Sequence, residues 1–275
     1  MRYPVEQALS HLRQMAPQGM ADTRWPITLN FHPDITVSGQ LVIERLADDG
    51  NYRSQFETGM SSGGLTAYPG GDRWNWESRI FGGAYDDQDA FFRPKYGALN
   101  YRYDPVGGSR RFGSSHFRLR PHVRARTSFS YPDSHLEPKD FAVDDVQPLV
   151  ALADENAISL DPWLDNYIEA HIHGPVAIEE DVEALILDPS FKGTSIEDIA
   201  FSLGCDVEWH AGFRLSLDCL NQCQMYRGTA AANAISEIAE DAWVTPALLW
   251  RARDTVLDYQ TAKWVWHCIA RYGYR

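Results

Sequence analysis

Long apolar runs are missing from this sequence of 275 residues. No stretch approaches the ~20 consecutive apolar residues that a membrane-spanning helix requires. The first residues also lack the apolar stretch of a secretory signal. We therefore expect a cytoplasmic protein without a membrane partner, and delivery to another cell by a route that reads other signals stays open.

Cysteine is scarce, and all four cysteines lie beyond residue 204. Only Cys219 and Cys223 are close in sequence, and no C-x-x-C pair occurs. This spacing gives little support to a structural zinc site and favours reduced, partly buried thiols. The sequence also lacks the P-loop, the G-x-G-x-x-G fingerprint of dinucleotide-binding Rossmann proteins and the G-x-S-x-G turn of serine hydrolases.

Basic charge is in deficit, with 25 Lys and Arg against 38 Asp and Glu and a net charge of −13. Bulk attraction to nucleic acid is therefore not favoured. The charge is unevenly spread, because residues 93–126 carry nine basic side chains and one acid, whereas residues 140–198 carry fifteen acids and one base. The two segments are either solvated surfaces that attract each other, or the basic one is a cationic wall for a phosphate-bearing ligand.

Aromatic residues are plentiful, with 9 Trp, 13 Tyr and 12 Phe, and 44% of the residues are hydrophobic. This composition supplies a folded core and excludes a disordered chain. Strand-like alternation, as in 27–32, dominates the first two thirds, and helical spacing begins near a capped start at Thr194-Ser195-Ile196-Glu197. The sequence predicts an α+β protein with three parts: an N-terminal helix (1–21), a strand-rich core (22–192) and a helical annex (193–275).

A polar segment and a glycine-rich segment follow one another after residue 50. Residues 51–58 are predicted to form a strand, with Arg53 and Gln55 on one face and Ser54 on the other. The glycines from Gly59 onward would let backbone N–H groups approach a ligand closely. Long loops of this kind commonly bind something, so the two segments are a candidate ligand-binding floor.

The stretch Tyr167 to Gly174 is the most informative one. Glu169, His171 and His173 lie on one face of a predicted strand, because side chains alternate with a period of two. A His-x-His pair on a strand can bind zinc or iron, but residues 177 and 178, where a cupin-type site carries a glutamate, are Ala and Ile. Alternatively, Glu169 stabilises a cationic sugar intermediate, or it forms a structural ion pair with an arginine.

Several strings along nearly the whole chain resemble an uncharacterised bacterial family of unknown function. They include ITLNFHPD at 27–34, YRSQFETG at 52–59 and YIEAHIHG at 167–174. The order of elements also resembles ADP-ribosyltransferase domains of bacteria and phages, which are split β-sheets that bind NAD in a cleft. Those domains carry His or Arg on the first strand, Ser, Thr or Tyr on a middle strand and Glu on a late strand. His32 and Glu169 match the first and last of these positions.

Two features of the sequence depart from that pattern. The middle motif is not a clean Ser-Thr-Ser, and the usual Glu-x-Glu or Gln-x-Glu pair is absent. In the family, Gln often stands at the position of His171. These departures leave open the identity of the acceptor and the activity itself.

The resemblance implies an ADP-ribosyltransferase-like split sheet and an NAD-dependent ADP-ribosyltransferase, such as a bacterial toxin or effector, that uses NAD as a substrate and releases nicotinamide. The acceptor is an unknown macromolecule, a small molecule or water. Glu169 would hold a ribose 2′-OH as an ionised carboxylate, its pKa kept low by His171 or an arginine. Arg53 or an arginine of 93–126 would bind the pyrophosphate, and His32 the adenosine-side ribose. The residues implied to bind NAD are His32, Arg53, Ser54, Gln55, Thr58, Gly59, Gly63, Gly64, Tyr96 and Ser115, with Glu169 and His32 catalytic and no metal.

Two other functions fit the residues. A metal-dependent enzyme would use His171 and His173 as ligands. A catalytically inactive NAD-binding fold or protein-interaction module would instead present the aromatic-rich helices near the C-terminal end of the sequence to a partner. Those helices contain Trp243, Trp250, Trp264 and Trp266.

Overall fold

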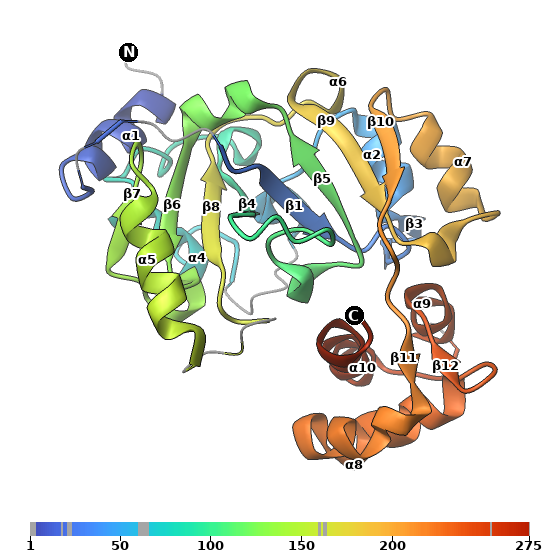
Figure 1. The fold of residues 1–275 in the computed structure, drawn as a ribbon. Coiled ribbons are helices and arrows are strands. Elements are labelled where there is room, and N and C mark those ends of the chain that lie inside the picture. Colours follow the sequence, from blue (N-terminus) through green and yellow to red (C-terminus); the bar gives the residue numbers. More distant parts are fainter. Residues whose placement is uncertain are drawn as a thin grey trace.

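A computed structural model describes residues 4–17, 19–20, 24–59, 66–158, 161, 164–253 and 255–274. The fold is α+β and is built on an eight-stranded sheet of order β10-β9-β5-β1-β4-β8-β6-β7 (Figure 1). β9 and β10 run parallel, and the other neighbours in the sheet run antiparallel. The strands are β1 (Ile27–Phe31), β4 (Lys95–Leu99), β5 (Ser115–Leu119), β6 (Thr127–Tyr131), β7 (Asp140–Ala142), β8 (Ile168–Ile172), β9 (Val182–Leu187) and β10 (Asp206–Trp209).

Helices and two short hairpins surround this sheet. The helices are α1 (Pro4–Arg13), α2 (Val42–Asp49), α3 (Gln55–Thr58), α4 (Asp72–Ile80), α5 (Gln147–Glu155), α6 (Ile178–Asp181), α7 (Ser195–Phe201), α8 (Leu220–Ile238), α9 (Pro246–Arg253) and α10 (Tyr259–Tyr272). The hairpins pair β2 (Thr36–Val37) with β3 (Gln40–Leu41), and β11 (Leu215–Ser216) with β12 (Trp243–Val244). Within the described residues, no helix combines the length and apolar character needed to cross a membrane.

Alternation along the strands divides the sheet into an apolar and a polar face. Leu29 of β1 lies opposite Phe117 of β5, and both belong to the main core cluster together with residues of α2, α5 and α7. The other face carries Glu169 and His171 of β8, which lie opposite Ser130 and Ser128 of β6. α4 covers this polar face, because the Trp76 ring lies 5.3 Å from the His171 ring. The polar strand residues are thus buried under α4, where each needs a hydrogen-bond partner.

The sheet opens into a fork between β1 and β4. These strands pair only at Ile27↔Leu99 and Thr28↔Ala98, whereas β4 pairs with β8 along all five of its residues. A Cβ atom at Gly97 would lie 2.4 Å from the Thr28 carbonyl oxygen, so glycine is needed where the two strands begin to part. Beyond this point the end of β1 and the start of β4 diverge, and the space between them is available to a ligand.

The predicted boundaries are met only approximately. α1 ends at Arg13 within the predicted helix 1–21, and the segment after residue 193 contains four helices of the described chain, α7 to α10. That segment also supplies β10 to the main sheet, and α8 to α10 pack around a second core cluster below the sheet (Figure 1). The strand predicted for residues 51–58 is wrong, because Gln55–Thr58 is the helix α3.

The basic and acidic segments of the sequence are joined by ion pairs. Arg118 binds Glu183 with a shortest N–O distance of 3.3 Å, Arg126 binds Asp181 at 2.8 Å, and Arg111 pairs with Asp165. These contacts support the interpretation of two surfaces that attract each other. Arg111, Arg118 and Arg126 are therefore engaged by carboxylates of the acidic segment.

Candidate functional site

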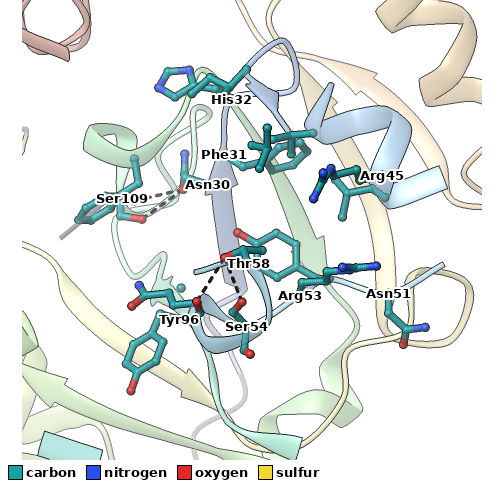
Figure 2. A pocket seen from close by; sticks show the side chains of 18 of the residues that line it. Asn30, Phe31, His32, Arg45, Asn51, Arg53, Ser54, Thr58, Tyr96 and Ser109 are labelled. Carbon is teal, nitrogen blue, oxygen red and sulfur yellow. Dashed lines mark hydrogen bonds between the residues drawn. The ribbon is translucent and has the colours of Figure 1, made fainter. Parts of the chain in front are cut away.

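A cavity of about 220 Å³ occupies the fork between β1 and β4, and we call it the fork cavity (Figure 2). The ends of β1 and β4, helices α2 and α3, and side chains from α4 and β8 line it. Most of the predicted site residues meet here, although they come from distant parts of the sequence. The predicted residues that line it are His32, Arg53, Ser54, Gln55, Thr58, Tyr96 and Glu169.

The remaining predicted site residues lie elsewhere. Ser115 is buried on β5, and its hydroxyl oxygen accepts a hydrogen bond from the Asp188 backbone N–H at 3.3 Å. Gly59 ends α3 with a φ of 65° and is not among the lining residues. Gly63 and Gly64 fall outside the described residues.

Glu169 is nearly fully buried at one end of the cavity, which we call the Glu169 end. Its carboxylate oxygens lie 3.1 Å from His171 Nε2 and 3.1 Å from Ser134 Oγ. Burial raises the Glu169 pKa to about 8, with a further rise from Asp133, while Arg73 opposes it. The expected low pKa is therefore wrong. His171 does not lower it as a cation, because burial depresses the His171 pKa to about 3 and the ring is neutral.

An arginine that sequence reasoning missed completes this end. Arg73 of α4 is 3% exposed, donates from Nη1 to Ser134 Oγ at 2.8 Å, and lies 4.2 Å from the centre of the Tyr96 ring. Its Nε has no hydrogen-bond partner among the described residues. A buried guanidinium with an unused donor is suited to an anionic or hydroxyl-bearing ligand. No motif marked Arg73, because α4 reaches the site only through the tertiary fold.

Tyr96 is fixed on the floor of the cavity by a buried ion pair. Its hydroxyl donates to Glu77 Oε1 at 2.7 Å, and the other Glu77 oxygen accepts from Arg93 Nη1 at 2.7 Å. Both Glu77 and Arg93 are buried. The ring of Tyr96 is thereby held under Arg73, beside the position of Glu169.

His32 follows β1 and lies across the cavity from Tyr96, in a part that we call the His32 end (Figure 2). Its ring packs edge-on against Trp250 of α9 at 4.6 Å and Trp266 of α10 at 4.5 Å between ring centres. The Trp250 indole N–H donates to His32 Nδ1 at 3.0 Å. Burial lowers the His32 pKa to about 3, so the ring is neutral and Nε2 carries its proton. Nε2–H is left as a donor for a ligand.

Two arginines form the wall beside α2 (Figure 2). Arg53 forms an ion pair with Asp49, with N–O distances of 2.5 and 2.6 Å. Arg45 has a buried Nε without a hydrogen-bond partner in the described part of the chain. Arg45 therefore offers this wall a donor that no described residue uses. No sequence motif includes Arg45, which lies on the helix after the predicted first strand.

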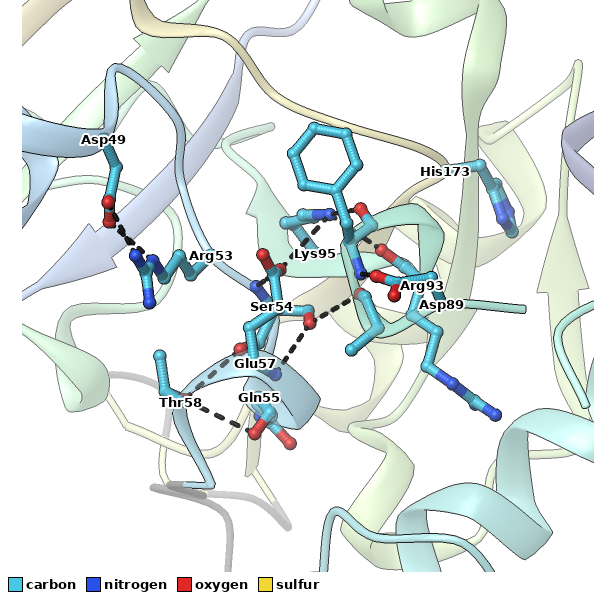
Figure 3. A network of polar contacts seen from close by, with 12 residues as sticks. Asp49, Arg53, Ser54, Gln55, Glu57, Thr58, Asp89, Arg93, Lys95 and His173 are labelled. Carbon is cyan, nitrogen blue, oxygen red and sulfur yellow. Dashed lines mark hydrogen bonds and ion pairs between the residues drawn. The ribbon is translucent and has the colours of Figure 1, made fainter. Parts of the chain in front are cut away.

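Helix α3 is held against β4 by a polar network (Figure 3). Ser54 caps α3: its Oγ accepts from the Glu57 N–H at 3.2 Å and donates to the Ala90 carbonyl at 2.9 Å. The Glu57 carboxylate accepts a hydrogen bond from the Ser54 N–H at 2.7 Å, which completes a capping box. Buried Lys95 lies 3.7 Å from Glu57, and burial lowers its pKa to about 8. The signal for this helix, Ser-x-x-Glu, was present in the sequence and was overlooked.

The His171–His173 pair is engaged by the protein itself. His171 Nδ1 and His173 Nε2 both contact Ser128 Oγ, at 3.1 and 2.8 Å. His173 Nδ1 contacts the Tyr85 hydroxyl at 2.8 Å. The described residues contain no group of three or more His, Cys, Asp and Glu side chains arranged to hold a metal ion. His171 and His173 are thus part of a line of hydrogen bonds behind Glu169.

Comparison with known proteins identifies one family. Its model, described as a protein of unknown function (DUF3626), matches residues 26–157 and 146–272. No curated protein matches the chain.

Proposed function

The chain belongs to the DUF3626 family, whose function is unknown, and we propose from its fork cavity that it is an NAD-dependent ADP-ribosyltransferase. One observation carries the proposal. His32 after β1, Tyr96 on β4 and Glu169 on β8 line a single cavity, and these three strands are neighbours in the sheet. His32 and Glu169 match the first and last positions of the resemblance described above, and Tyr96 is a tyrosine on the strand between them. A sheet that forks between its first and middle strand also fits an ADP-ribosyltransferase-like split sheet.

The charges of the cavity suit a dinucleotide. Arg45 and Arg53 line one wall, where guanidinium groups could bind a pyrophosphate through paired hydrogen bonds. His32 Nε2–H would donate to a ribose hydroxyl. The cavity volume of about 220 Å³ is below the ~300–1,000 Å³ typical of cavities that enclose a drug-sized ligand. NAD would therefore bind with its reacting ribose inside and its remainder along the arginine wall.

The proposed reaction breaks the glycosidic bond between the ribose carbon C1′ and the nicotinamide nitrogen. Nicotinamide leaves with the bonding electron pair, and the ribose becomes positively charged. Ionised Glu169 would accept a hydrogen bond from the 2′-OH and stabilise this charge. An acceptor then forms a bond to C1′ and loses its proton; water as acceptor gives free ADP-ribose. Because the Glu169 pKa is about 8 in the unliganded protein, the rate should rise with pH until this carboxyl is ionised.

Nicotinamide release from NAD tests the proposal. We expect Glu169→Gln to reduce release about 100-fold or more, since it removes the preorganised charge. Gln has nearly the same size, so the variant should still bind ADP-ribose in calorimetry. Glu183→Gln is the matched control, because Glu183 is a half-exposed residue on β9 that pairs with Arg118. It should release nicotinamide at the wild-type rate.

Two results would contradict this function. The first is a wild-type protein that neither binds ADP-ribose nor releases nicotinamide at any pH between 6 and 9. The second is equal release by wild type and Glu169→Gln, which would leave Glu169 with a structural role. Binding of ADP-ribose without nicotinamide release would instead identify a catalytically inactive NAD-binding fold.

A further inference from the structure

Behind Glu169, a line of hydrogen bonds runs through the polar face of the sheet. It links the Tyr85 hydroxyl, His173, Ser128, His171 and Glu169 in that order. The contacts measure 2.8 Å, 2.8 Å, 3.1 Å and 3.1 Å along the line. None of Tyr85, Ser128, His171 and His173 lines the fork cavity, and all of them are buried.

The direction of each hydrogen bond follows from the number of protons available. Within the described part of the chain, the Tyr85 hydroxyl has His173 Nδ1 as its hydrogen-bond partner, so the hydroxyl donates and Nδ1 accepts. A neutral imidazole then carries its proton on Nε2, which donates to Ser128 Oγ. Burial keeps His173 neutral by lowering its pKa well below the usual value.

The same count continues from Ser128 to the carboxylate. The Ser128 hydroxyl has one proton, and His171 Nδ1 is the acceptor that remains for it. His171 must therefore carry its own proton on Nε2, which faces Glu169 Oε1 at 3.1 Å and Ser130 Oγ at 3.4 Å. The other carboxylate oxygen, Oε2, accepts from Ser134 Oγ. With Glu169 ionised, every proton of the line from Tyr85 to Glu169 then meets an acceptor.

We propose that Tyr85, His173 and Ser128 are positioning residues that hold His171 in the tautomer whose Nε2–H donates to Glu169. The phenolic hydroxyl at the far end sets the direction of the line, because reversing it would leave the Tyr85 proton without an acceptor. His171 then favours the ionised carboxylate and fixes its orientation toward the cavity. The catalytic consequence rests on the proposed function, whereas the tautomer does not.

Other groups that face Glu169 do not replace this donor. Asp133 lies near it and disfavours its ionisation, while Arg73 and Ser134 favour it. Tyr96 and Tyr167 stay neutral, since burial raises their pKa values well above the usual one. Ser130 on β6 offers its oxygen to His171 rather than to Glu169. Whether His171 donates to Glu169 or accepts from it is therefore decided by Ser128, His173 and Tyr85, which do not contact Glu169 themselves.

Nitrogen-15 NMR of the histidine rings in the wild-type protein tests the tautomer directly. We expect His171 and His173 both as the neutral Nε2–H form, unchanged between pH 5.5 and 8, with signals assigned by loss in His171→Gln and His173→Gln. The Nδ1–H form or an imidazolium at either residue overturns the proposal. This readout needs no enzymatic activity, so it stands even if no nicotinamide is released.

The variant Tyr85→Phe tests the consequence for Glu169. It removes one hydroxyl outside the cavity, and we expect the pH midpoint of nicotinamide release to move upward by roughly one unit, a tenfold loss near pH 7. KM and the rate at high pH should change little. Tyr131→Phe is the control, because it removes a buried hydroxyl that donates to Asn166 at 2.9 Å, outside the line. An equal midpoint in wild type and Tyr85→Phe, or an equal shift in Tyr131→Phe, overturns the proposal.

Discussion

At the Glu169 end of the fork cavity, the functional side chain is held by hydrogen bonds and charges. At the His32 end, the functional side chain is held between aromatic rings. Glu169 contacts His171 and Ser134 and lies in the fields of Asp133 and Arg73. His32 takes one indole hydrogen bond and is enclosed by Trp250 and Trp266.

This difference separates chemistry from recognition. A group that stabilises a developing charge needs an environment that sets its own ionisation, and the Glu169 end provides one. A group that donates to a sugar hydroxyl needs only a fixed position and a fixed tautomer. The His32 end achieves this with residues of α9 and α10, so the C-terminal helices are part of the cavity's structure.

The largest expected loss of stability comes from removing the packing at the His32 end. Trp250→Ala should lower the free energy of unfolding by about 3–5 kcal/mol, because truncating a buried Trp leaves a cavity. Urea unfolding followed by circular dichroism measures this loss. Trp264→Ala, at a half-buried position on the same group of helices, should cost clearly less. Equal losses would show that the packing around Trp250 contributes no more to stability than that around Trp264.

A smaller effect tests the charge at the Glu169 end. The folded pKa of Glu169, about 8, lies above the usual glutamate value of 4.5. The folded state therefore holds this proton while the unfolded state loses it, and stability falls as pH rises from about 4.5 to 8. Glu169→Gln cannot ionise. From pH 5 to 7.5, the unfolding free energy of wild type should fall relative to that of the variant by about 3 kcal/mol.

Urea unfolding of both proteins across this pH range measures the difference, with Glu183→Gln as the control for an exposed carboxylate. A difference between wild type and Glu169→Gln that is independent of pH would mean that Glu169 is ionised in the folded protein. Burial at the Glu169 end would then not keep the carboxyl of Glu169 protonated.

Sequence reasoning found the parts of the site that depend on local periodicity. Glu169 and His171 share a face because a strand alternates with period two, and the structure places both on β8. His32 was identified through the resemblance, which places a His on the first strand. The strand alternation and the resemblance together named one residue at each end of the cavity.

The residues that sequence reasoning missed reach the site through tertiary contacts. Arg73 arrives on α4, and Asp133 in the turn after β6, so neither could be placed beside Glu169 without knowing the strand order. The low pKa expected for Glu169 was wrong for the same reason, since burial and Asp133 outweigh Arg73. The helix α3 was missed although Ser54 and Glu57 announce a capping box.

The smallest expected effect is the pH dependence of stability that His32 causes. The folded pKa of His32, about 3, lies below the usual histidine value of 6.5. The His32 ring therefore binds a proton in the unfolded state but not in the folded state. Stability is lost as pH falls from 6.5 toward 3. His32→Gln removes this titration, so from pH 6 to 4 wild type should lose about 2.5 kcal/mol relative to the variant. The slope is opposite in sign to that of Glu169. His122→Gln, at an exposed histidine, is the control, and a pH-independent difference between wild type and His32→Gln would show that the ring can be protonated between the two tryptophans.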